Sequence, residues 1–243
     1  QTDYSPVELK TVSRQTDRHF LDILNRVREN RVDQPTLDEL NRRYIPDFRP
    51  GQDASYIRLT THNQQAQRIN QDRLQELPGR EFAFKAHVED DFPEYAYPTD
   101  ETITLKEGAQ VMFVKNDPNH RYYNGMIGDV CRLTDQGFCV RSKDTDEEIA
   151  VTTEEWANCK YELDQQTKEI TEVVEGVFKQ YPVKLAWAIT IHKSQGLTFD
   201  HAIIDVEHSF AHGQAYVALS RCKTLEGLVL SRPINRQAII CDG

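Results

Sequence analysis

One segment, residues 185–230, constrains the fold more than any other part of the chain. It reads LAWAITIHKSQGLTFDHAIIDVEHSFAHGQAYVALSRCKTLEGLVL, which predicts a strand, a polar loop with Gly196, a strand, a helix and a strand. Apolar runs of this kind are typical of a parallel sheet that is buried on both faces. In open α/β sheets, ligands bind at the carboxyl ends of the strands. We therefore expect the polar residues at 192–196 and at 220–221 to lie near a ligand site.

Composition narrows the class of protein. The formal net charge of −10 argues against nucleic-acid binding, which needs Lys and Arg. The acidity is concentrated, however, since residues 87–107 hold seven acids and one base and residues 144–175 hold eleven acids and two bases. The remaining residues carry more bases than acids and could form a basic face.

Five cysteines without a C-x-x-C pair predict neither a disulfide framework nor a zinc site, and we expect no metal site in this chain. Free thiols fit a reducing compartment, here the bacterial cytoplasm or nucleoid. No run of 18 apolar residues is present, so no membrane partner is expected. The chain begins at Gln1, and it has the look of a part of a longer protein.

Helical periodicity is clearest near the N-terminus, where Thr16 could cap a helix whose apolar stripe is Phe20, Ile23, Leu24 and Val27. Thr36 and Glu39 have the spacing of a capping box for a second helix. A strand is expected at 56–60. It precedes a helix with Ala66, Ile69, Leu74 and Leu77 on one side.

Short strands separated by turn signals dominate the middle of the chain and predict a small β-barrel. These strands are expected at 109–114, 126–133, 137–141 and 148–152. The predicted fold is thus α/β: a discontinuous parallel-sheet domain from residues 1–105 and 183–243, with the small barrel of residues 106–182 inserted in it.

Arg221 follows the helix of the long segment directly. A guanidinium held there could bind a phosphoryl group with a bidentate fork and neutralise charge in nucleotide hydrolysis. The alternative is an arginine that stabilises the carboxyl end of a helix. Arg14, in the SRQTD stretch, has little independent weight.

Two polar turns could bind phosphate oxygens. Thr190, His192, Lys193, Ser194 and Gln195 place several donors in one turn, and Gly196 lets the backbone approach a ligand. A solvated connector is the alternative there. Thr61, His62 and Asn63 lie between a strand and a helix, whose N-terminus attracts anions, although Asn63 could simply cap that helix.

Several motifs together resemble one family. LAWAITIHKSQGLTFD and GQAYVALSRCKTLEGL are similar to the last two conserved motifs of superfamily-one DNA helicases, in particular the petite-integration-frequency (PIF) helicases and their RecD-like relatives. ELKTVSRQTDRHFLDILNRVREN resembles the arginine motif of these helicases, and YIRLTTHNQQAQRIN resembles the strand-helix segment that follows it. EGAQVMFVKND and NGMIGDV resemble the opening of an inserted barrel of the Src-homology (SH3-like) type.

The resemblance implies the second RecA-like domain of an ATP-dependent helicase that moves 5′ to 3′ on single-stranded DNA and serves DNA repair or recombination. Arg221 matches the arginine finger, and Arg14 matches a second arginine that reaches the γ-phosphate. Gln195 and Gly196 match the loop that couples the nucleotide cleft to the DNA track. Candidates for DNA phosphate contacts are Thr61, His62, Asn63, Thr190, His192, Lys193 and Ser194.

The sequence lacks the phosphate-binding loop G-x-x-x-x-G-K-[ST]. The resemblance therefore implies that ATP and Mg²⁺ are bound mainly by a RecA-like domain upstream of Gln1, and that the isolated chain has no ATPase activity. Leu197 and Thr198 follow Gly196 where RecD-like members tend to carry an acid. A second reading is a non-catalytic module that binds single-stranded nucleic acid, and a third is a protein-interaction domain that uses the acidic stretches.

Overall fold

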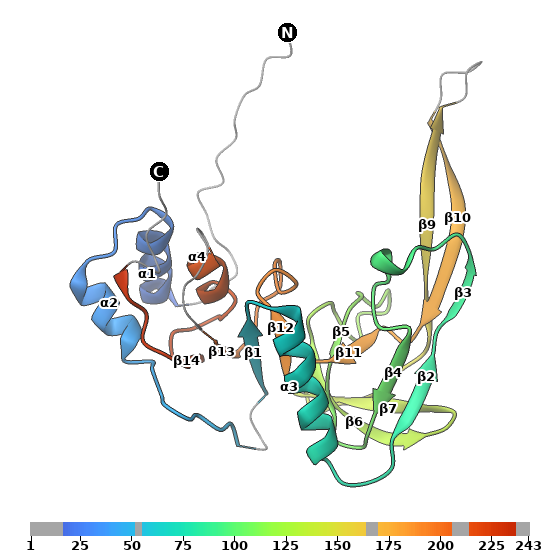
Figure 1. Ribbon diagram of the computed structural model, residues 1–243, viewed down its shortest axis with the longest axis horizontal. Coiled ribbons are helices and arrows are strands. Elements are labelled where there is room, and N and C mark those ends of the chain that lie inside the picture. The colour runs from blue at the N-terminus through green and yellow to red at the C-terminus, as the bar shows by residue number, and fades with distance from the viewer. Residues whose placement is uncertain (1–16, 52–54, 164–169, 206–213, 237–243) are drawn as a thin grey trace. The chain divides into compact units, whose positions relative to one another are not determined.

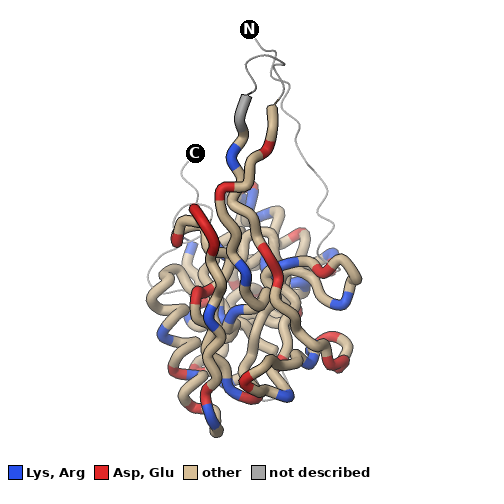
Figure 2. Tube along the Cα trace, turned by 90° about the vertical axis from the view of Figure 1, so that its right-hand side faces the viewer, with Lys and Arg blue, Asp and Glu red and all other residues tan. Residues whose placement is uncertain are grey.

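The computed structural model describes residues 17–51, 55–163, 170–205 and 214–236. The chain divides into two compact units, one of residues 1–67 and 188–243 and the other of residues 68–187. Figure 1 shows the helices and the strands that make up each unit. Basic and acidic positions are interspersed along the trace (Figure 2), and many are paired, as in Arg141 with Glu148 and Arg121 with Asp117. The basic face that the composition allows stays a prediction.

The first unit is built on a four-stranded parallel sheet in the order β12-β1-β13-β14. Its strands are β1 (Tyr56–Thr60), β12 (Ala188–Thr190), β13 (His201–Ile204) and β14 (Leu228–Leu230). Helix α4 (Gln214–Leu219) lies between β13 and β14 in the chain. Strands β12 and β14 are buried along their whole length. The predicted α/β class with a parallel sheet is therefore confirmed.

The expected start of the parallel strand was wrong. Residues 183–185 form β11 (Val183–Leu185), which pairs antiparallel with a strand of the second unit. The next strand of the parallel sheet, β12, begins only at Ala188. The apolar run of residues 185–189 extends from the end of β11 into β12, so hydropathy alone does not mark the change of sheet.

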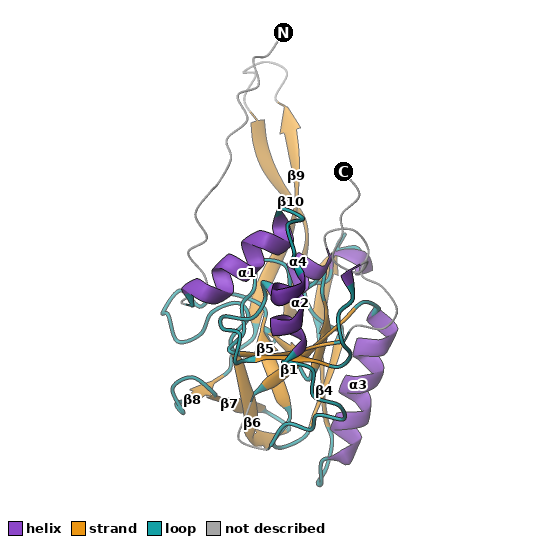
Figure 3. Ribbon diagram, turned by 90° about the vertical axis from the view of Figure 1, so that its left-hand side faces the viewer, coloured by secondary structure: helices purple, strands orange, loops and turns teal. Residues whose placement is uncertain are grey.

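Two N-terminal helices, α1 (Arg18–Arg28) and α2 (Gln34–Asn41), belong to the first unit (Figure 3). The predicted stripe of α1 is buried, and each such side chain stabilises the fold by about 1.5–3 kcal/mol. Asp17 rather than Thr16 caps α1, accepting hydrogen bonds from the backbone N–H groups of His19 and Phe20.

The predicted capping box of α2 was also wrong. Asp33 is the N-cap and accepts a hydrogen bond from the Thr36 backbone N–H at 3.0 Å. Pro35 fits in the first turn of α2, because the backbone N–H that proline lacks would have no partner within the helix there. Glu39 instead contacts His19 of α1, with 2.5 Å between Oε1 and Nε2, and this pairing raises the pKa of His19. The carboxylate thus joins two helices instead of capping one.

The second unit is mainly antiparallel. Its largest sheet has the order β11-β5-β6-β7-β8, formed with β5 (Gln110–Phe113), β6 (Ile127–Thr134), β7 (Gly137–Ser142) and β8 (Glu148–Ala150). β2 (Phe82–Lys85) pairs with β4 (Thr102–Leu105), and a 3₁₀ turn covers Glu94–Ala96. The four predicted strands are present, whereas the SH3-like class of this unit stays a prediction.

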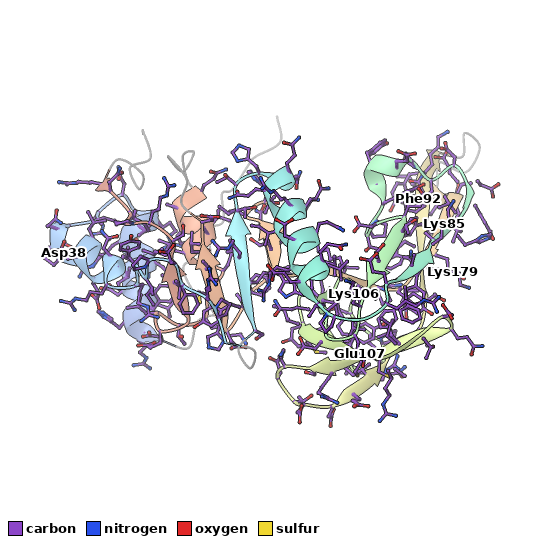
Figure 4. The ribbon with its side chains drawn as sticks, turned by 60° about the horizontal axis from the view of Figure 1, so that its bottom comes forward. Asp38, Lys85, Phe92, Lys106, Glu107 and Lys179 are labelled. Carbon is purple, nitrogen blue, oxygen red and sulfur yellow. The ribbon has the colours of Figure 1, made fainter. Side chains whose placement is uncertain are left out.

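The division between the units falls at positions other than the expected 105/106 and 182/183, for a reason of packing. Leu74 of α3 (Asn63–Glu76) is fully buried in the same apolar cluster as Leu105, Phe113 and Val140. Lys106, labelled in Figure 4, donates from Nζ to the Leu77 carbonyl at 3.0 Å. The end of α3 therefore packs with the β-rich unit.

A long hairpin of the second unit was not expected. β9 (Glu154–Leu163) pairs antiparallel with β10 (Ile170–Gln180) over the whole of both strands, and β3 (His87–Asp90) pairs only with residues 176–179 of β10. The far half of the hairpin is therefore a two-stranded ribbon that projects from the unit (Figure 1).

Across the described ranges, no helix has the length and the apolar character needed to cross a membrane.

Candidate nucleotide and nucleic-acid edge of the parallel sheet

Two of the predicted phosphate-binding turns meet at one edge of the parallel sheet. Thr60, the last residue of β1, is the register partner of Thr190, the last residue of β12. The Ile191 N–H donates to the Thr60 carbonyl at 2.9 Å. Because the strands are parallel, residues 61–63 and 191–196 leave the sheet side by side at its carboxyl edge. This is the edge at which ligands of α/β proteins bind.

The turn of residues 191–196 is held by its own polar groups. Thr190 Oγ1 accepts from the Lys193 N–H at 3.3 Å, and the Ser194 N–H donates to the Thr190 carbonyl at 3.0 Å. Ser194 Oγ donates to the Ile191 carbonyl at 2.7 Å, and the Ser194 side chain is fully buried. These two hydroxyl groups therefore shape the turn, while His192 and Lys193 are exposed to solvent.

The two predicted coupling residues are also exposed. Gln195 donates its backbone N–H to the His192 carbonyl at 3.2 Å. Gly196 has a φ of +86°, and no atom lies within 4 Å of the position that a Cβ would take. Glycine is favoured here by the left-handed backbone and not by crowding, and the bare backbone is open to a ligand.

The first turn of α3 forms the other half of this edge. Buried Thr60 donates from Oγ1 to the His62 carbonyl at 3.2 Å, and this carbonyl also accepts from the Ala66 N–H. Thr61 Oγ1 lies 2.8 Å from His62 Nδ1. Asn63 is the first residue of the helix and not its cap. The backbone N–H groups of such a first turn carry partial positive charge and favour anions.

Arg221, which follows α4 in the chain, contacts the turn of residues 191–196 at this edge. Its side chain is mostly buried, with the residue 9% exposed. Nη1 donates to the carbonyls of Ser194 at 3.2 Å and Leu197 at 3.0 Å, and Nε donates to the Val217 carbonyl at 2.9 Å. Nη2 donates to Ser220 Oγ at 2.9 Å. The guanidinium is thus bound directly to the turn that holds Gln195 and Gly196.

Arg14, the second predicted arginine, lies outside the described residues. Among the described residues, no group of three or more His, Cys, Asp and Glu side chains is arranged to hold a metal ion.

Asp205, which the sequence analysis missed, lies at the same edge directly after β13. Its Oδ2 accepts from Gln65 Nε2 at 3.0 Å and lies 3.5 Å from Arg58 Nη1, and its Oδ1 accepts from Ser231 Oγ at 2.8 Å. The signal for it was present, because an acid ends the apolar strand HAII as it enters the predicted ligand edge.

Comparison with known proteins places this geometry in a class. Residues 185–229, which hold β12, its turn, β13, α4 and most of β14, match the UvrD-like helicase C-terminal domain. This match takes in the turn of residues 191–196 and Arg221, and the turn of residues 61–63 lies outside it.

The whole chain identifies the helicases to which it is related. ATP-dependent DNA helicase Pif1 of Bdellovibrio bacteriovorus is 34% identical over 98% of this chain and 52% of the relative. Human ATP-dependent DNA helicase PIF1 is 36% identical over 97% of this chain and 36% of the relative. The chain is homologous to the C-terminal part of the Pif1 DNA helicases. It spans about half the length of the Bdellovibrio relative and 36% of the human one.

Two solved structures of a Pif1 helicase are also similar to this chain. Unliganded Pif1 from Bacteroides sp. has a TM-score of 0.87 and 40% identity over 96% of this chain and 53% of that chain. Bacteroides Pif1 in complex with ADP-AlF3 and single-stranded DNA has a TM-score of 0.70 and 42% identity over 97% of this chain and 54% of that chain.

Proposed function

We propose that this chain is the lobe of an ATP-dependent 5′-to-3′ DNA helicase that supplies the arginine finger and part of the single-stranded DNA track. ATP and Mg²⁺ would be bound mainly by another RecA-like domain of the same protein, since no phosphate-binding loop occurs in these 243 residues. The observation that carries the proposal is the bonding of Arg221 to the turn beside the first turn of α3. Bacteroides Pif1, a homologue, has been solved with ADP-AlF3 and single-stranded DNA.

Arg221 would act on a phosphate oxygen that builds up charge as the terminal phosphoryl group is transferred. Its fork of donors suits that oxygen. The bonds from Nε to the Val217 carbonyl and from Nη2 to Ser220 Oγ hold the side chain in place before the reaction. Arg14 would be the second such arginine. The Nη1 bonds to Ser194 and Leu197 are the ones that a phosphate oxygen would compete for.

DNA would be bound at the exposed part of the same edge. His192 and Lys193 on one turn and Thr61, His62 and Asn63 at the start of α3 would contact backbone phosphates, which carry no sequence information. Thr190 and Ser194 would contribute mainly through the turn that their hydroxyl groups hold. Release of Arg221 from Ser194 and Leu197 would loosen that turn, so that Gln195 and Gly196 couple nucleotide binding to DNA binding.

The test compares this chain with the full-length protein. We expect the isolated chain to bind single-stranded DNA with an affinity that falls as salt rises, and to hydrolyse no ATP. The full-length protein should hydrolyse ATP, with stimulation by single-stranded DNA. Robust DNA-stimulated hydrolysis by the isolated chain would refute the division of labour between the two lobes.

A non-catalytic module for single-stranded nucleic acid is the second candidate. It is favoured by the exposure of His192 and Lys193 on a turn that the hydroxyl groups of Thr190 and Ser194 hold. This candidate predicts that DNA affinity in the full-length protein is the same with and without an ATP analogue, whereas a motor couples the two.

A further inference from the structure

Asp205 joins three elements of the parallel-sheet unit at its carboxyl edge. Its backbone N–H donates to the Leu59 carbonyl of β1 at 2.9 Å, and its side chain is only 15% exposed. The two carboxylate oxygens serve different directions. Oδ1 accepts from Ser231, which follows β14, and Oδ2 accepts from Gln65, which lies in the first turn of α3.

The bond to Gln65 fixes how α3 begins. Gln65 is the third residue of the helix, so its side chain sets the rotation of the first turn about the helix axis. The bond goes to the side-chain amide of Gln65 and not to a backbone N–H of that turn. Rotation of this turn would displace His62 and Asn63 together with the backbone donors beside them.

We propose that Asp205 is a positioning residue for single-stranded DNA: it holds the first turn of α3 in the orientation that presents its donors to a phosphate. The inference rests on the proposed function, because it requires that DNA binds at this edge. It adds a residue that touches no DNA in the proposal and acts through Gln65.

Electrostatic repulsion alone predicts the opposite change in DNA affinity when Asp205 is replaced by an uncharged residue. A carboxylate near a phosphate site repels the phosphate, so removal of its charge alone should tighten DNA binding. Positioning predicts weaker binding when the hydrogen-bond acceptor is lost. The sign of the change therefore separates the two effects.

The test uses the full-length protein and a fluorescent oligothymidine, with anisotropy at low salt and a thermal melt for each variant. Asp205→Leu removes the acceptor at similar size and should raise the DNA Kd about tenfold, as expected for a lost hydrogen bond to a charged group. Asp205→Asn keeps an acceptor for Gln65 and should bind within about threefold of the wild type, or more tightly. An Asp205→Leu variant that melts cooperatively and binds as well as or better than the wild type would overturn the proposal.

Two further variants keep the test decisive if Asp205→Leu does not fold. Gln65→Met removes the other end of the same bond and should raise the Kd at least about threefold, and an unchanged Kd would overturn the proposal. Ser231→Ala breaks the Oδ1 bond, away from α3, so it should lower the melting temperature without changing the Kd. An equal loss of DNA affinity in Ser231→Ala would show a general effect of stability and would also overturn the proposal. If the wild type binds no DNA, the proposed function itself fails.

Discussion

Replacement of Arg221 separates a catalytic arginine from a structural one, because the structure gives the side chain a measurable structural role. Arg221→Ala removes donors to three carbonyls, those of Ser194, Leu197 and Val217. A hydrogen bond from a charged donor contributes about 1.5–3 kcal/mol, and the contributions within one network are not additive. We expect the unfolding free energy of this unit to fall by about 3 kcal/mol.

The same replacement should reduce catalysis far more than stability. An arginine finger contributes about 10³–10⁵ in kcat, so DNA-stimulated hydrolysis by Arg221→Ala should fall at least about 10³-fold. ATP binding should stay largely intact, because the phosphates are held mainly by the other lobe. Hydrolysis is measured at saturating DNA and ATP, and binding with a fluorescent ATP analogue.

Arg221→Lys is the matched control. The ammonium keeps the charge and can donate to one or two of the carbonyls, so it should restore part of the lost stability. It lacks the planar fork, so kcat should stay at least about 100-fold below that of the wild type. If kcat recovers in step with stability in Arg221→Lys, or if Arg221→Ala loses ATP binding as severely as hydrolysis, the arginine is structural and the reasoning is refuted.

Three other predictions concern stability and reactivity. Burial raises the pKa of the Cys222 thiol to about 11, so in the native protein at pH 8 iodoacetamide should leave Cys222 unmodified, as peptide mass spectrometry can verify. The side-chain hydrogen bond from Arg121 lowers the pKa of Asp117 to about 2, so its stabilisation is full above pH 4 and is lost as pH falls towards 2. Asp117→Asn should therefore flatten the fall in melting temperature between pH 4 and 2, and an unchanged slope would contradict this. A Cβ on Gly227 would lie 1.9 Å from the Asp200 carbonyl oxygen, so Gly227→Ala should lower the unfolding free energy by about 3 kcal/mol or more. Gly196→Ala, in open space, should lower it by only about 1 kcal/mol. Equal losses for the two variants in denaturant melts would show that the backbone at Gly227 shifts to make room for the methyl group.

The parts of the fold that the sequence predicted are those in which burial imposes a periodic pattern. The stripe of α1 and the fully buried strands β12 and β14 are almost entirely apolar, because water reaches neither the stripe nor these strands. The ribbon of β9 and β10 has no such constraint at its far end. Tyr161 and Ile170 are each 70% exposed there, so neither strand alternates between a buried and an exposed face. Without that alternation, a strand cannot be distinguished from a polar connector.

The candidate site, too, could be predicted from the sequence only in part. Contiguous motifs located Arg221, the turn of residues 191–196 and the start of α3, because each is a short run of polar residues after an apolar element. The division of roles among them depends on bonds between distant positions. Gln65 and Asp205 are 140 positions apart, and Arg221 is 27 positions from Ser194. Such bonds depend on strand order, which brings β13 next to β1, and hydropathy specifies that order only weakly. A single acid at the end of an apolar strand is therefore a sequence signal worth testing once strand order is known, since its partners are then the residues that follow the neighbouring strands.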